Sequence, residues 1–162
     1  MKLALKIFLI LGISIVGIFA KEININKTLQ EAKLQNKQIM LFFHIPRCPY
    51  CTSMLKENFN NKKILDNISK NFILIDIYTA DKKIVIFNDF KGTPKEFAKL
   101  IGASAYPATI FMNRSSKVIY KSIGYRNIEE QLAEIKFIAT NSYKTIDLET
   151  FKINLEIEDD ED

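Results

Sequence analysis

The sequence has little material for crosslinks or metal sites, with two cysteines, one histidine and no tryptophan in 162 residues. A single cysteine pair cannot supply a framework of several disulfides, so a folded domain must depend on a hydrophobic core. The composition permits such a core, because 48% of the residues are hydrophobic and 11% are aromatic. We therefore expect one domain of ordinary size.

An excess of charge of one sign is also missing. The formal net charge is +4, and two of the basic residues, Lys2 and Lys6, belong to the N-terminal segment. The other lysines are scattered along the chain instead of forming a phosphate-binding stripe, so the sequence does not indicate a nucleic-acid partner. Residues 156–162 contain six acids. Such a run predicts a solvated, disordered tail, with a docking role as the alternative.

One long apolar stretch, residues 7–20, follows Lys2 and Lys6 and ends where the chain turns polar at Lys21. This layout is typical of a secretory signal peptide, and Ala20 provides the small residue that cleavage needs. About fourteen residues are short for a membrane span, which needs about 20. We predict that residues 1–20 are a signal peptide, with an uncleaved N-terminal anchor as the alternative. The domain is then expected in a bacterial periplasm, where disulfides persist.

In the first half of the chain, two apolar strands are expected on either side of helical sequence. Both strands are apolar on their two faces, which places them inside a covered sheet. Two strands joined through a helix form a parallel unit. The predicted elements are a helix at residues 28–37, strands at 39–44 and 72–78, and helical sequence from 49 to about 70 with a break near 60.

The second half predicts two capped helices with a hairpin between them. Thr93 and Glu96 form one capping box, and Asn127 and Glu130 form another. Residues 84–87 are apolar and fit either a short strand or a patch on an insertion, and the sequence does not decide between the two. The predicted elements are a helix at residues 93–102, hairpin strands at 108–112 and 117–121, and a helix at 127–138.

The two cysteines form the motif Cys48-Pro49-Tyr50-Cys51 between an apolar strand and helical sequence. One turn of helix brings sulfurs at this spacing within disulfide range, and we interpret the motif as a redox dithiol. Because Pro49 suits the first helical position, Cys48 is expected at the N-cap, where unpaired N–H groups and the helix dipole favour a thiolate. A permanent structural disulfide is the alternative, although closing so short a loop removes little entropy from the unfolded chain.

The order of elements resembles the thioredoxin fold over residues 24–140. Two motifs carry the resemblance: the Cys-Pro-Tyr-Cys sequence, and Ala105-Tyr106-Pro107-Ala108-Thr109-Ile110-Phe111, where family members have a cis-proline opposite the dithiol. The resemblance implies an α/β thioredoxin fold, with a central mixed sheet flanked by helices and an insertion before the cis-Pro107 loop. The thioredoxin-like domain is then expected at residues 21–140, and a C-terminal extension with an acidic tail at 141–162.

Within this superfamily, the chain is most similar to periplasmic thioredoxin-like proteins found with sulfur-oxidation and cytochrome-maturation systems. It is also similar to the soluble thioredoxin domain of the transmembrane disulfide reductase. Phe42-Phe43-His44 before the cysteines, the insertion, and Gly124-Tyr125 after the hairpin carry this likeness.

The family likeness implies roles for four residues. Cys48 is expected to be the exposed nucleophile and Cys51 the resolving cysteine that releases the substrate thiol. Tyr106 and Pro107 are expected to contact a substrate peptide. The likeness favours a reductase over the alternatives of an oxidase or an isomerase, between which the sequence itself does not decide. It implies cysteine-containing periplasmic proteins as substrates and a membrane thiol–disulfide protein as electron donor, and no cofactor is expected.

The site also departs from that of ordinary thioredoxins. Arg47 stands where thioredoxins have a tryptophan, and Phe42 stands where many have a buried acid that assists proton transfer. Arg47 and His44 are expected to tune the thiolate, and Asp76 on the neighbouring strand is expected to replace the acid if it points toward the sulfurs. For His44 and Asp76 the alternatives are a packed histidine and a structural strand-end acid.

Two other functions stay open at this point. Cys48, Cys51 and His44 form a set that suits copper or zinc, as in a metallochaperone, although a structural zinc site usually takes four ligands. The cis-proline of the fold normally keeps metals away from the sulfurs, so no metal is expected. The second alternative is a non-catalytic binding module that docks through the scaffold and the acidic tail.

Overall fold

The computed structural model describes residues 22–160, so the predicted signal peptide at residues 1–20 lies outside the described residues. These residues form seven strands, six α-helices and two short 3-10 turns. The strands are β1 (Glu22–Asn24), β2 (Gln38–His44), β3 (Phe72–Tyr78), β4 (Ile84–Phe87), β5 (Phe90–Gly92), β6 (Ala108–Met112) and β7 (Val118–Ile123). The helices are α1 (Ile25–Leu34), α2 (Pro49–Lys56), α3 (Lys62–Asn71), α4 (Pro94–Ile101), α5 (Ile128–Ala139) and α6 (Leu148–Asp160), with 3-10 turns at Asn58–Asn60 and Ser142–Lys144.

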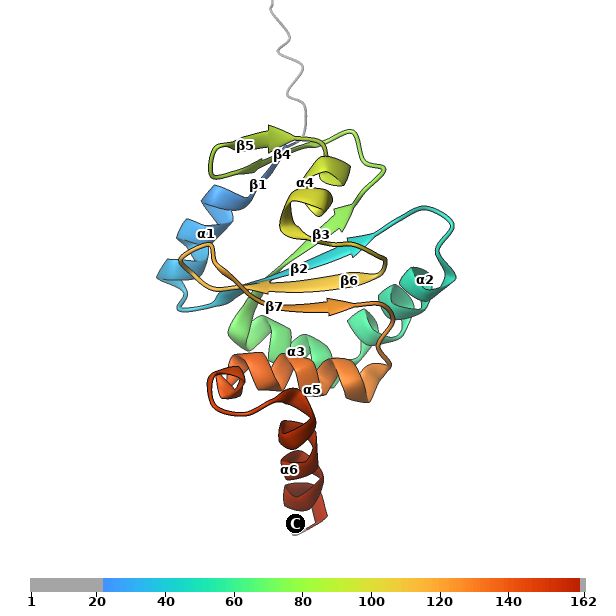
Figure 1. The fold of residues 1–162 in the computed structure, drawn as a ribbon, viewed down its shortest axis with the longest axis vertical. Helices are drawn as coiled ribbons and strands as arrows, with labels where there is room; N and C mark the ends of the chain where they lie inside the picture. The colour runs from blue at the N-terminus through green and yellow to red at the C-terminus, as the bar shows by residue number, and fades with distance from the viewer. Residues whose placement is uncertain (1–21, 161–162) are drawn as a thin grey trace, which may run out of the picture.

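The central sheet has the strand order β3-β2-β6-β7. Strand β2 runs parallel to β3 and antiparallel to β6, and β6 runs antiparallel to β7, so the predicted mixed sheet is confirmed. Helices α1 and α4 lie on one face of this sheet, and α3 and α5 lie on the other (Figure 1). Because side chains alternate along a strand, Leu41 and Phe43 of β2 join the core under α1 and α4, whereas Met40 joins the core under α3 and α5.

Residues 84–87, which the sequence leaves undecided, form strand β4 of a second sheet. Its order is β1-β4-β5, with β4 parallel to β1 and antiparallel to β5. The ring of Phe97 on α4 packs against Phe43 of the central sheet and against Phe87 and Phe90 of the small sheet, at centroid distances of 5.9, 5.5 and 5.7 Å. Helix α4 therefore joins the two sheets through one buried aromatic side chain.

Most helix starts lie where the sequence places them. Both capping boxes are present, at Thr93 with Glu96 and at Asn127 with Glu130. The first helix is an exception, because it covers Ile25–Leu34 and not the predicted residues 28–37. Its cap is Asn24, whose side chain accepts a hydrogen bond from the backbone N–H of Lys27, and this cap starts the helix three residues early.

The prediction of a disordered acidic tail is wrong for residues 156–160, which belong to helix α6. Asp147 accepts a hydrogen bond from the backbone N–H of Thr150 at 2.8 Å at the start of this helix, and Phe151 packs against Phe137 of α5 at 5.3 Å. Helix α6 thus extends from α5 at the end of the molecule opposite the small sheet (Figure 1). Within residues 22–160, no helix combines the length and apolar content that a membrane crossing needs.

Candidate active site at the start of helix α2

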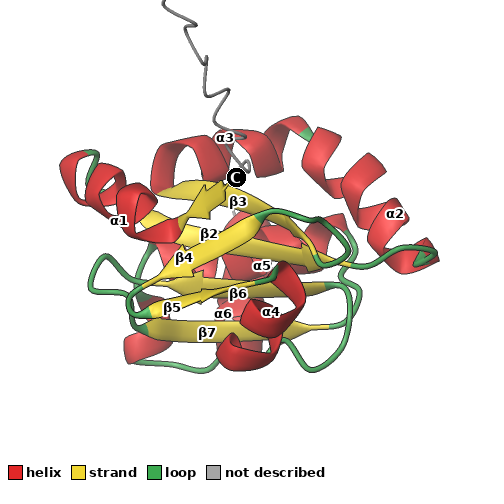
Figure 2. Ribbon diagram, turned by 90° about the horizontal axis from the view of Figure 1, so that it is seen from above, coloured by secondary structure: helices red, strands yellow, loops and turns green. Residues whose placement is uncertain are grey.

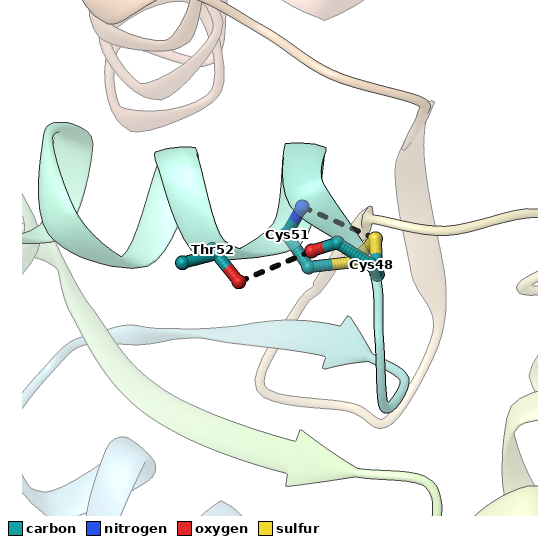
Figure 3. Close-up of a disulfide and its surroundings, with 3 residues drawn as sticks. All are labelled: Cys48, Cys51 and Thr52. Carbon is teal, nitrogen blue, oxygen red and sulfur yellow. Dashed lines mark hydrogen bonds between the residues drawn. A yellow bond between two sulfur atoms is a disulfide. The ribbon is translucent and has the colours of Figure 1, made fainter.

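Cys48 and Cys51 form a disulfide where helix α2 begins, with 5.3 Å between their Cα atoms (Figure 3). Cys48 is the N-cap residue in an extended conformation, and Pro49 occupies the first helical turn, as the sequence predicts. The backbone N–H of Cys51 donates to Cys48 Sγ at 3.1 Å. Thr52 donates to the Cys48 carbonyl oxygen from its backbone N–H at 3.1 Å and from its hydroxyl at 3.2 Å, which holds the cap in place.

The two cysteines differ in their exposure to solvent. Cys51 is 2% exposed, whereas Cys48 is only partly buried. In the dithiol form, the same N–H of Cys51 and the positive end of α2 would favour a negative charge on Cys48 Sγ, because both act on an anion at the N-cap. Cys48 is therefore the more exposed residue of the pair and stands at the helix start that would activate its sulfur, whereas Cys51 is buried.

The Tyr106–Pro107 peptide bond is cis, the isomer expected from the sequence. Ala108 pairs with Phe43 near the end of β2, so the turn before it lies at the sheet end from which the chain leads to Cys48. Figure 2 shows α2 beyond this end of the central strands. Burial raises the pKa of the Tyr106 hydroxyl. The contacts of Tyr106 and Pro107 with a substrate peptide stay a prediction.

His44, the last residue of β2, lies next to Asp76 on the neighbouring strand β3. His44 Nε2 lies 2.9 Å from Asp76 Oδ1, but the two atoms lack the alignment of a hydrogen bond. The imidazole is packed against Phe42 and Tyr78, at centroid distances of 5.8 and 4.9 Å, whereas the Asp76 side chain is 59% exposed. Asp76 therefore lies in solvent beside His44 and does not occupy the buried position of a proton-transferring acid.

Phe42 fills that buried position and is 1% exposed. Its ring meets the ring of Phe59 edge to face at 4.7 Å, so β2 packs against the 3-10 turn that follows α2. Arg47 is exposed and has a left-handed backbone with φ of +55°. A tuning role for Arg47 or His44 stays a prediction.

The segment that follows β7 contacts the site, and the sequence does not predict these contacts. The ring of Tyr50, between the two cysteines, lies 5.7 Å from the ring of Tyr125. Gly124, with φ of +98°, donates its backbone N–H to the Pro107 carbonyl oxygen at 2.8 Å. Gly124-Tyr125 is visible in the sequence as a family-like dipeptide, but no local signal says which residues these two contact.

A buried charged group lies under the same segment. The Glu134 side chain is 1% exposed, and its Oε1 accepts hydrogen bonds from Arg126 Nε at 2.8 Å and from the Ser122 hydroxyl at 2.7 Å. Burial raises the pKa of Glu134 and outweighs these bonds, which lower it. Burial alone would lower the pKa of Arg126, but the bond to Glu134 and the charge of that carboxylate leave it raised. Glu134 and Arg126 thus form an ion pair in a poorly solvated part of the protein.

Metal ligands do not gather in the described part of the chain. Across residues 22–160, no three His, Cys, Asp or Glu side chains form a group that could hold a metal ion. Cys48 and Cys51 use their sulfurs for each other, and His44 faces Asp76. The chemistry that this arrangement supports is thiol–disulfide exchange, in which the disulfide reacts with a partner dithiol, or the reduced pair reacts with a partner disulfide.

Solved structures share this architecture at low sequence identity. A thioredoxin-fold protein from Helicobacter pylori is 23% identical, with a TM-score of 0.65, over 74% of this chain and 86% of that one. A putative disulphide-isomerase from Bacteroides thetaiotaomicron is 22% identical, with a TM-score of 0.58, over 72% and 88% of the two chains. The C-terminal domain of Neisseria meningitidis DsbD in its oxidised form is 12% identical, with a TM-score of 0.52, over 72% and 97%. At these identities the likeness establishes the fold.

No curated protein matches the chain. The model of a thioredoxin-like domain matches residues 25–139, which is most of the chain and contains both cysteines and Pro107. The predicted α/β thioredoxin fold is thereby confirmed, and its Cys-x-x-Cys pair forms the disulfide at the expected helix start. The chain belongs to the thioredoxin-like domain family.

Proposed function

We propose that the protein is an exported thiol–disulfide oxidoreductase that reduces disulfides of periplasmic proteins. The observation that carries the proposal is the unequal pair of cysteines, with Cys48 only partly buried at the N-cap of α2 and Cys51 buried within the helix. A disulfide with only a structural task has no need for one accessible sulfur at a helix N-terminus.

The proposed reaction moves two electrons from the dithiol to the client. The Cys48 thiolate attacks one sulfur of the client disulfide, so that a mixed disulfide forms and the first client thiolate leaves. Cys51 then loses its proton to solvent and attacks Cys48 Sγ. The bond between Cys48 and the client breaks, the second client thiolate leaves and takes up a proton, and the protein holds the disulfide seen here.

The proton step must proceed without a buried acid of the thioredoxin kind. Phe42 occupies that place, and the Asp76 side chain on the neighbouring strand lies beside His44 and is largely exposed. We infer that water at the partly open site accepts the Cys51 proton. The dithiol is then restored by a membrane thiol–disulfide protein, and the reaction needs no cofactor.

Different observations support the export of the protein and the reducing direction of its reaction. The N-terminal charge and apolar pattern supports a periplasmic location. Likeness to periplasmic reductases supports the direction, which depends on the reduction potential of the pair relative to its partners. A reductase in that compartment would need electrons delivered through the membrane.

The experiment is a trapping test with two variants. A Cys51→Ala variant, expressed with its own N-terminus, is expected to accumulate mixed disulfides through Cys48 in a periplasmic extract, whereas Cys48→Ala is the matched control and is expected to capture none. The reduction potential, measured against glutathione, sets the direction. Equal and negligible capture by both variants would contradict the proposal, as would a purified protein that carries one metal ion per chain.

A further inference from the structure

The segment Gly124–Asn127 connects three parts of the candidate site. Gly124 bonds to the Pro107 carbonyl oxygen, and the Tyr125 ring contacts Tyr50 between the cysteines. At the other end of the segment, the Arg126 carbonyl oxygen accepts a hydrogen bond from Asn58 Nδ2 at 2.9 Å. The backbone of this short segment is thus tied to the proline turn and to the residues that follow α2.

The Arg126 guanidinium holds the backbone of Tyr125 directly. Its Nη1 donates to the Tyr125 carbonyl oxygen at 2.9 Å, while its Nε donates to Glu134 on α5. Glu134 is anchored by the Ser122 hydroxyl on β7. A charged carboxylate below the surface therefore orients a guanidinium, and the guanidinium orients the residue whose ring lies next to the dithiol.

Asn58 closes the network from the side of α2. It is fully buried, and its amide donates to the carbonyl oxygens of Arg126 and Asn127 and to Gln131 Oε1, at 2.9, 3.3 and 2.6 Å. Gln131 is fully buried as well. An apolar core would be a simpler way to fill this space, because buried polar and charged groups lose their hydration. What the network provides is a defined position for the segment that it holds.

We propose that Asn58, Arg126 and Glu134 are positioning residues for client recognition. They hold Tyr125 against Tyr50, so that the two rings form an aromatic wall beside the dithiol, and this wall receives an apolar or aromatic client side chain next to the target cysteine. This inference rests on the proposed function and specifies its substrate class.

The two tyrosine rings offer apolar surface, and not charge, to a bound chain. Tyr50 is 64% exposed, so its ring offers an apolar surface to a bound chain. Arg126, the cation within the segment, already pairs with Glu134. A client residue such as phenylalanine or leucine gains contact area with both rings, whereas serine gains little.

The test compares two disulfide-linked peptides that differ only in the residue beside the cysteine, phenylalanine in one and serine in the other. The wild-type protein is expected to have a KM for the phenylalanine peptide about threefold to tenfold lower than for the serine peptide. Tyr125→Ala is expected to bring the ratio of the two KM values close to one. Glu134→Gln and Asn58→Ala are also expected to bring this ratio closer to one, because they free the segment Gly124–Asn127 without removing a ring.

The control is Glu129→Gln, an exposed acid on the same helix as Glu134, which is expected to keep the wild-type ratio. Thermal unfolding is measured for each variant, because a loss of stability alone raises both KM values or lowers both rates and leaves their ratio unchanged. An unchanged ratio in folded Glu134→Gln and Asn58→Ala would refute the positioning role. If the wild type reduces both peptides with equal KM, only this inference fails, whereas a wild type that reduces neither peptide contradicts the proposed function itself.

Discussion

Replacement of Phe42 by alanine should destabilise the protein strongly. Phe42 is 1% exposed, meets Phe59 edge to face at 4.7 Å and stacks on His44 at 5.8 Å. Truncation of a buried phenylalanine to alanine costs about 3–5 kcal/mol, because apolar surface is lost and a cavity is left. Of this, the aromatic pair with Phe59 accounts for about 0.5–1.5 kcal/mol. The predicted consequence is a looser contact between β2 and the turn that follows the dithiol helix.

Urea unfolding of the oxidised protein measures this effect. With a slope of about 2 kcal/mol per molar urea, the midpoint of Phe42→Ala is expected about 1.5–2.5 M below that of the wild type. Leu34→Ala is the matched control, since this leucine is 88% exposed, and it is expected to change stability by less than about 0.5 kcal/mol. A double-mutant cycle with Phe59→Ala isolates the ring pair. A midpoint shift of less than about 0.5 M for Phe42→Ala would refute the packing argument.

Three further predictions concern a cap, a buried acid and the last helix. Hydrogen bonds from the backbone N–H and the hydroxyl of Thr93 hold the pKa of Glu96 below its ordinary value, so this stabilisation is present at neutral pH and lost as pH falls through the lowered pKa. Thr93→Ala is expected to cost about 1 kcal/mol at neutral pH, and the difference in melting temperature from the wild type should narrow towards about pH 2; a difference independent of pH would contradict this. Burial raises the pKa of Glu134, so the folded state holds this proton more tightly, and stability should decrease as pH rises from about 4.5 through the raised pKa. The free energy of unfolding of Glu134→Gln, measured in urea, should not show this decrease. A difference in unfolding free energy between wild type and variant that does not change with pH would contradict the prediction. Phe151→Ala should release α6 and speed the amide exchange of this helix at least about tenfold. Ile153→Ala, at an exposed position of the same helix, is the control and should leave the exchange rate unchanged. Equal exchange rates in the two variants would show that Phe151 does not hold α6 in place.

Features that depend on neighbouring residues could be predicted from the sequence. Thr93 with Glu96, and Asn127 with Glu130, contact each other within one helical turn, so the local sequence pattern is enough to identify the contact. The disulfide of Cys48 and Cys51 is also a contact within one turn. The apolar runs of β2 and β3 showed that both faces of the sheet would be covered, without showing by which residues.

Tertiary structure decided the features that join distant segments. Residues 84–87 became a strand because β1 and β5, each only three residues long, pair with them, and strands so short carry no pattern of their own. The acidic end of the chain is helical because Phe151 packs on α5, which composition does not reveal. Asp76 lies next to His44 because β2 and β3 pair in parallel with Phe42 opposite Asp76, which places His44 two positions further along the same face.

The candidate site shows the same division. The motif around Cys48 determined by itself which sulfur lies at a helix start, since a proline and a helix dipole act over a few ångströms of contiguous chain. That Tyr125 meets Tyr50, and that Glu134 is buried under Arg126, was decided only when β7 and α5 packed against the rest of the protein. Burial and contact between distant side chains are properties of the folded core, because they depend on which surfaces exclude water together, and a linear pattern of residues does not specify that.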